Sequence, residues 1–248
     1  MAETVSTTQK LTGFQQVGIF HEVFGHPQEK KLYTEVFDEN QKLVSFRLSL
    51  ITEEFDEFVE ACQKSDFVEA IDAIADLLFV TYGMCQAFGI NFDELTGMPH
   101  LIYKLKPYTS PNRQIFSNNH ATLDAETLFL KETIDQLTSA CKEKNMNSVK
   151  NSLYDIVRVC YTISTIFNVS IDDCFDEVFR SNMTKVCASE EEAKETVGWY
   201  KQNELRYKDP SYRESSGNKY WVVYDAATSK ILKSIKFELP KLAEVVGL

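Results

Sequence analysis

The stretch Ile51–Phe88, ITEEFDEFVEACQKSDFVEAIDAIADLLFVTYGMCQAF, determines how the rest of the chain is interpreted. A polar turn at Gln63–Asp66 divides it into two segments, and both carry the three- and four-residue spacing of helices. Helices joined by such a short turn pack antiparallel. The acidic residues lie on stripes where residues facing a core are expected: Glu54 and Glu57 in the first helix, and Glu69, Asp72 and Asp76 in the second.

These carboxylates predict a metal site. The alternative is an ordinary solvated face, but Glu53, Glu54, Glu57, Glu69 and Asp72 all lack a Lys or Arg at i+4. Burying unpaired anions is costly, so a bound cation is the better interpretation. Oxygen ligands without sulfur or imidazole favour Mg²⁺, with Mn²⁺ as the alternative. The 4 histidines lie outside both helices, and no Cys or His pair has zinc spacing.

The two motifs also carry a family resemblance. Glu-Glu-x-x-Glu at Glu53, Glu54 and Glu57, followed by Glu-x-x-Asp at Glu69 and Asp72, resembles the MazG-like all-α nucleoside triphosphate pyrophosphohydrolases. That superfamily includes the dimeric dUTPases and the phosphoribosyl-ATP pyrophosphohydrolases. The segments Phe14–Gly25 and Arg180–Lys185 are similar to one branch of it.

The resemblance implies Mg²⁺-dependent hydrolysis of a nucleoside triphosphate, such as dUTP or dCTP, between the α and β phosphates. The expected metal ligands are Glu54, Glu57, Glu69 and Asp72, and Asp76 supports them from one helical turn further along. Glu53 lies one residue off the ligand stripe and is the candidate to orient or deprotonate the water. The expected substrate-binding residues are Asn182, Lys185 and Arg180.

The helix pair occurs twice. Shifting positions 53–93 by 79 residues gives 9 identities without a gap, including Asp76 with Asp155 and Tyr82 with Tyr161. The second copy lacks the anions, since Thr133, Gln136, Ser148 and Asn151 stand where the first copy has the expected ligands. We therefore expect an all-α, MazG-like bundle made of two tandem degenerate repeats, a pseudo-dimer, with a small C-terminal β-hairpin.

The expected organisation has two parts packed as one core. Residues 1–118 form the repeat that carries the carboxylates. Residues 119–248 form the degenerate repeat with the substrate-binding segment and the hairpin. Because Asn182 and Lys185 follow the second repeat, we expect them to reach the carboxylates of the first.

The remaining local patterns are simpler. Thr12 is a candidate N-cap for a helix over Gly13–Phe24, and Met1–Leu11 is expected to be disordered. Residues 107–120 are typical of a linker. Ser189 and Glu192 predict a capping box, with Glu190–Glu192 solvated. The alternation in Tyr220–Tyr224 and Ile231–Ile235 predicts the two strands of the hairpin.

Composition limits the partners. The net charge of −11, from 26 basic and 37 acidic residues, argues against nucleic-acid binding, which needs basic surface. The 6 cysteines have no paired spacing and suit a reducing compartment. With no targeting segment and no run of transmembrane length, we expect a cytoplasmic protein without a membrane partner. The expected partner is a nucleoside triphosphate, and a homodimer of pseudo-dimeric chains is one expected assembly.

Two other functions stay open from sequence. The first is a phosphoribosyl-ATP pyrophosphohydrolase-like activity of the same site. The second is a catalytically inactive nucleotide-binding or scaffold protein, against which the intact carboxylates of the first repeat argue.

Overall fold

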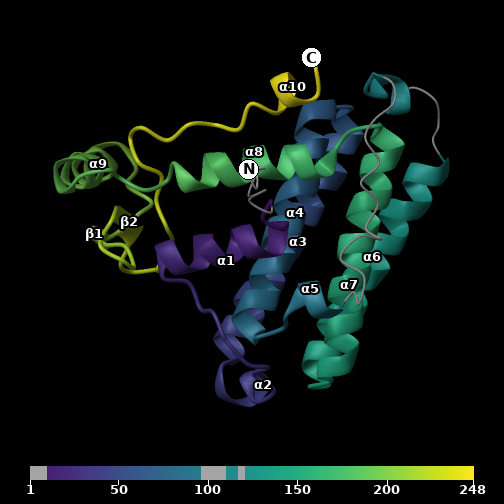
Figure 1. The fold of residues 1–248 in the computed structure, drawn as a ribbon, viewed down its shortest axis with the longest axis horizontal. Coiled ribbons are helices and arrows are strands. Elements are labelled where there is room, and N and C mark those ends of the chain that lie inside the picture. The colour runs from purple at the N-terminus through teal and green to yellow at the C-terminus, as the bar shows by residue number, and fades with distance from the viewer. Residues whose placement is uncertain (1–9, 96–109, 117–120) are drawn as a thin grey trace, which may run out of the picture.

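The computed structural model describes residues 10–95, 110–116 and 121–248, and most of them are helical. Two helix pairs form the centre: α3 (Gln41–Lys64) with α4 (Phe67–Phe88), and α6 (Ala121–Lys142) with α7 (Met146–Phe167). In Figure 1 the pairs stand side by side, and α1 (Gly13–Phe24) and α8 (Ile171–Met183) run across the first pair. The all-α prediction is confirmed.

Shorter elements connect these helices. Residues 1–9 of the expected disordered start, and residues 107–109 and 117–120 of the expected linker, lie outside the described residues. The cap of α1 is as predicted, with the Thr12 side chain accepting from the Gln15 amide in a capping box. The other elements are α2 (Val36–Glu39), α5 (Phe92–Leu95), η1 (Arg113–Phe116), α9 (Glu190–Asn203), β1 (Pro210–Glu214), β2 (Trp221–Asp225) and α10 (Leu242–Val245).

The second helices of the two central pairs begin and end at corresponding positions. The bounds of α7 are those of α4 shifted by the same 79 residues that align the sequences. Asp66 caps α4 by accepting from the Glu69 amide at 3.1 Å, and Asn145 caps α7 by accepting from the Ser148 amide at 3.1 Å. Asp and Asn both offer the side-chain oxygen that this position requires. The turn before α7 therefore keeps the cap geometry of the turn before α4, although the cap residue is no longer charged.

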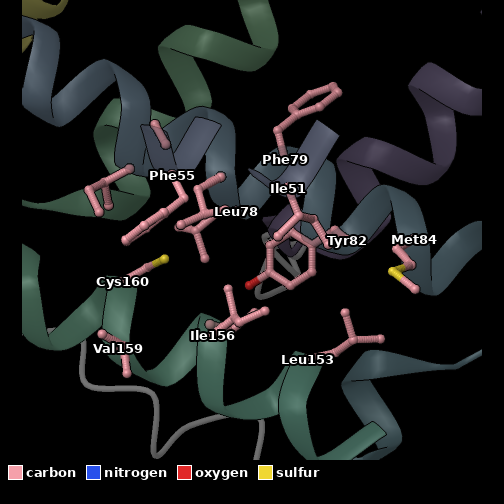
Figure 2. Close-up of a cluster of buried hydrophobic side chains, with 14 of the residues drawn as sticks. Ile51, Phe55, Leu78, Phe79, Tyr82, Met84, Leu153, Ile156, Val159 and Cys160 are labelled. Atoms are coloured by element: carbon pink, nitrogen blue, oxygen red, sulfur yellow. The ribbon is translucent and has the colours of Figure 1, made fainter. Parts of the chain in front are cut away.

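One apolar core joins the pairs. Ile51 of α3 and Leu78 of α4 are buried in the same cluster as Ile156 and Val159 of α7. Figure 2 shows these side chains pointing toward one another from the two sides. The core is continuous across the repeats because α4 packs on α7 and α3 packs on α6.

Equivalent residues meet where the repeats touch. Tyr82 of α4 and Tyr161 of α7 occupy the same repeat position, and each hydroxyl group lies close enough to the other to shift its pKa. Figure 2 shows the Tyr82 hydroxyl pointing from α4 toward α7. A residue and its equivalent come together at the axis of an isologous interface. The contact between Tyr82 and Tyr161 is therefore the one expected if the two repeats are arranged like the subunits of a dimer.

The C-terminal hairpin is present, but one of its strands was predicted wrongly. β2 covers most of the expected strand, whereas its partner is β1, which precedes it. Gly217 (φ 84°) and Asn218 (φ 54°) supply the left-handed backbone for the turn between them. The expected partner Ile231–Ile235 contributes only an isolated antiparallel bridge between Ile231 and Tyr224 of β2, with the Leu232 amide donating to the Val223 carbonyl at 2.9 Å. Beyond this bridge the segment is held by α9, because the Lys233 amide donates to the Tyr200 hydroxyl.

The expected solvated turn at Glu190–Glu192 also needs correction. The Glu192 amide donates to the Ser189 side chain, as the capping box requires. The Glu192 residue, however, is only 6% exposed. Its carboxylate accepts from the Ser234 hydroxyl at 2.6 Å and from Lys236 Nζ at 2.9 Å. Glu192 thus fastens the C-terminal segment to α9.

Within the described ranges, no helix is both long and apolar enough to cross a membrane.

The shared core predicts one cooperative unfolding transition. Ile156 is 0% exposed, so Ile156→Ala should destabilise the protein by about 2–5 kcal/mol through lost burial and a cavity. Ile235 is 44% exposed, and Ile235→Ala should change stability by about 0.5 kcal/mol or less. Urea denaturation followed by far-UV circular dichroism measures both. Two separate transitions, only one of which moves with Ile156→Ala, would contradict a single core.

Candidate active site

The acidic residues come together along the seam where α3 packs on α4, which we call the groove. Glu54 of α3 and Asp72 and Asp76 of α4 are half-buried, while Glu57 and Glu69 are exposed along its edge. In Figure 1 these helices run along each other beneath α1 and α8. The antiparallel pairing predicted from sequence therefore assembles carboxylates from both motifs.

Mutual repulsion shows how close these groups lie. Burial first, and then the charges of Asp76, Glu57, Glu53 and Asp72, raise the pKa of Glu54 to about 9. Burial and then the charge of Asp72 raise the pKa of Asp76 to about 7. Burial followed by Glu69 and Glu57 raises the pKa of Asp72 to about 6. Each carboxyl thus feels groups from the other helix or the next turn, so both motifs form one electrostatic site.

The cluster has the donor set for a divalent cation. Throughout the described chain, none of these carboxylates makes an ion pair within 4.0 Å, and Asp72 Oδ1 is buried without a hydrogen-bond partner. An unpaired buried oxygen among like charges fits an oxygen-ligated ion. Over these same residues, however, no three acidic, His or Cys side chains lie close enough together to hold one. Binding would require the side chains to turn toward one another.

Two lysines from the C-terminal half face this cluster. Burial lowers the pKa of Lys185, while the nearby charges of Asp76 and Glu54 raise it. The charge of Lys233 lowers the pKa values of Asp72 and Asp76. Lys185 follows α8, as the sequence interpretation required. Lys233 was missed, because its segment was interpreted only as a strand of the hairpin.

The remaining predicted residues lie differently. Glu53 is exposed beside Glu54, and its charge contributes to the raised pKa of Glu54. Asn182 is 9% exposed in the last turn of α8. Arg180 pairs with Glu177 at 2.8 Å and with Glu238 at 2.7 Å. Its guanidinium is thus already engaged on the C-terminal segment, and a substrate role for Arg180 stays a prediction.

A cationic group occupies the other end of the same groove, and the sequence interpretation missed it. Arg47 lies seven residues before Glu54, two helical turns along the same face of α3, and is 4% exposed. Burial lowers its pKa to about 10. The signal in the sequence was that Arg47 lies on the same helix stripe as the carboxylates. However, an Arg among the apolar residues of Phe46–Ile51 also fits the edge of an ordinary amphipathic helix.

The second repeat shows how the same positions look without this chemistry. Thr133, in the place of Glu54, is 1% exposed and donates its hydroxyl to the Phe129 carbonyl at 2.8 Å. Asp155, in the place of Asp76, pairs with Arg158 at 3.2 Å on the surface. In the second repeat, the buried position thus carries a neutral side chain, and the carboxylate at the surface has an ion-pair partner.

This contrast gives a matched pair of variants for stability without metal. The pKa of Asp76 is raised from 3.8 to about 7, so the folded protein holds this proton more tightly than the unfolded chain. Its contribution to stability is complete below pH 3.8 and is lost as the pH rises through 7. At pH 8, Asp76→Asn should therefore raise the free energy of unfolding by on the order of 1–3 kcal/mol.

Urea denaturation in a chelating buffer between pH 5 and pH 8 measures this effect, and the fall in stability should be shallower in Asp76→Asn. Asp155→Asn is the control and should change little, because its ion pair is exposed. Equal effects of the two variants would contradict a buried anion cluster.

Comparisons with known proteins agree with this site. The family described as phosphoribosyl-ATP pyrophosphohydrolase matches residues 17–97, which contain α3, α4 and both acidic motifs. An uncharacterized protein of Acanthamoeba polyphaga mimivirus is 36% identical over 250 residues, which is 97% of this chain and 98% of the viral protein. No solved structure matches the chain significantly. The chain belongs to the MazG-like all-α nucleoside triphosphate pyrophosphohydrolases, a family of hydrolases that act on phosphoric anhydride bonds.

Proposed function

We propose that this protein hydrolyses a nucleoside triphosphate between its α and β phosphates, releasing a monophosphate and pyrophosphate. The observation that carries the proposal is the half-buried group of unpaired carboxylates on α3 and α4, faced by Lys185. Anions without counter-ions are destabilising unless a ligand neutralises them. A metal-bound polyphosphate brings both the cation that the carboxylates need and the anion that Lys185 needs.

The family generally depends on a divalent metal ion, and we assign that ion here as Mg²⁺, with Mn²⁺ as a substitute. Glu54, Glu57, Glu69 and Asp72 would hold it, since they combine both motifs and include the unpartnered Asp72 Oδ1. When bound, such an ion neutralises phosphate oxygens and lowers the pKa of a bound water.

The chain's own groups have distinct roles in this proposal. Glu53 is exposed beside Glu54 and would orient the attacking water or accept its proton. Lys185 and Lys233 would bind phosphate oxygens, since their charges already act on the carboxylate cluster. Asp76 would fix Lys185 in position, because its charge raises the pKa of Lys185 more than any other neighbouring charge does.

The substrate that we propose is a deoxynucleotide such as dUTP or dCTP. A second candidate is phosphoribosyl-ATP, which the description of the matching family favours. Both contain the same anhydride bond, so the carboxylates and lysines do not distinguish them. A panel of the canonical nucleoside triphosphates, dUTP and phosphoribosyl-ATP, with Mg²⁺ and chromatographic detection of pyrophosphate and monophosphate, tests the choice. Turnover of none of them, with binding retained, would favour a scaffold protein instead.

The assignment of ligands predicts a contrast between the repeats. Asp72→Asn or Glu57→Gln should lower turnover by about 10²-fold or more, because each removes an anion that the ion needs. Gln136→Ala, at the repeat position of Glu57, should leave both turnover and the Mg²⁺ requirement unchanged. Initial rates over a Mg²⁺ titration measure both quantities. Similar losses in the two repeats would rule out a single site in the first.

The position of Lys185 predicts that the second half completes the site. Lys185→Met should lower turnover by about 10²-fold, since it removes a cation beside the carboxylates. Lys201→Met on the surface of α9 is the control and should retain activity. Steady-state kinetics on the full chain decide between them. Full activity of Lys185→Met would exclude the composite site.

A further inference from the structure

Arg47 is a buried cation that nothing in the described structure neutralises. The residue is 4% exposed, and both its Nε and Nη2 atoms lack a hydrogen-bond partner. No carboxylate contributes to its pKa, which burial alone lowers. A buried guanidinium without a partner is strongly destabilising, so its retention in a packed core calls for a ligand.

The unpaired atoms define the shape of that ligand. Nε and Nη2 form one of the edges of the guanidinium that can pair with two oxygens of a single acid group. Both atoms of this edge are buried at Arg47 and lack a hydrogen-bond partner, so a bidentate oxyanion that pairs with them must displace the groups packed against the edge. A single carbonyl or hydroxyl would satisfy only half of it.

The surroundings are positive and closely packed. A Cβ atom at Gly83 would lie 2.9 Å from Arg47 Nη1 and 3.1 Å from His21 Nε2, so the absence of a side chain at Gly83 lets both groups pack against α4. His21 Nδ1 donates to the Pro27 carbonyl at 2.8 Å. Burial and the charge of Arg47 lower the pKa of His21 to about 2, so its ring is neutral. The charges of Arg47, Arg213 and Lys185 all act on His26, which places three cations around this end of the groove.

Arg47 also shares the groove with the carboxylates. It lies seven residues before Glu54 on α3, about 10 Å along the helix axis, and Gly83 lies seven residues after Asp76 on α4. The same two faces thus carry the acidic cluster and then the cationic end. The cationic end is closed, since His21 is 2% exposed and Phe20 is 7% exposed.

We propose that the Nε–Nη2 edge of Arg47 binds the terminal phosphate of the substrate, so that the polyphosphate points inward and the nucleoside points toward the open end of the groove. This inference rests on the proposed function for the identity of the substrate. The binding site itself does not, because inorganic pyrophosphate carries the same group without a nucleoside.

Calorimetric titration of the full chain with inorganic pyrophosphate, in the presence of Mg²⁺, tests the site. Arg47→Met and Arg47→Lys should weaken binding about 10- to 100-fold, because neither offers a bidentate edge. Gly83→Ala should also weaken it, since the added Cβ displaces the guanidinium while its charge stays. Arg158→Met is the control and should bind as the wild type does, since Arg158 lies on the surface and pairs with Asp155.

Two further measurements separate this role from others. Titration with deoxyuridine monophosphate, which has no terminal β or γ phosphate, should show little change in Arg47→Met. Without ligand, Arg47→Met should melt at a higher temperature than the wild type, because it removes an unpaired buried charge. Unchanged pyrophosphate binding, an equal loss of monophosphate binding, or a lower melting temperature would each overturn the proposal. Arg47-dependent pyrophosphate binding without turnover of any nucleotide would instead support this site and reject the proposed function.

Discussion

The structure depends on one constraint, which is the placement of unpaired charges along the seam between two helices of a packed apolar bundle. Burial and the neighbouring acidic charges of α3 and α4 raise the pKa values of Glu54, Asp72 and Asp76, and Arg47 lies two turns away without an acidic partner. Charges placed in this way oppose folding. The surrounding core must offset them, and the continuous cluster that joins both repeats supplies that apolar burial.

The duplication explains how one chain can support such a seam. In a homodimer, both copies of the groove would carry the same charges and the same destabilisation. Here the second groove holds Thr133 in the place of Glu54, buried and hydrogen-bonded within its own helix. The second repeat thus contributes packing without a charge cluster. The proximity of the Tyr82 and Tyr161 hydroxyl groups keeps the contact expected between equivalent positions.

Sequence predicted the central helices well because their signals are local. Caps such as Asp66 and Asn145, and the spacing of apolar residues, act within a few positions of each helix end. The strand partner of β2 was predicted wrongly because two alternating segments flank it, and the choice depends on where Tyr200 and Glu192 hold the chain. Arg47 and Lys233 were missed for the same reason. The carboxylate motifs can be recognised because they are contiguous in the sequence. The role of the two cations depends on which residues the fold places beside them, and the sequence does not show that.

The order of charges along the groove gives the site its selectivity for a kind of ligand. The acidic cluster attracts a cation, the Arg47 end attracts an anion, and the two lie on the same helix faces. A free divalent ion would neutralise the acidic cluster and leave Arg47 unpaired. A free phosphate would pair with Arg47 and leave the acidic cluster unpaired. A metal–polyphosphate complex presents both charges in the order that the groove requires. Binding of such a ligand should recover the free energy by which the unpaired charges destabilise the empty protein. Because the ligand binds only the folded state, it should also raise the free energy of unfolding.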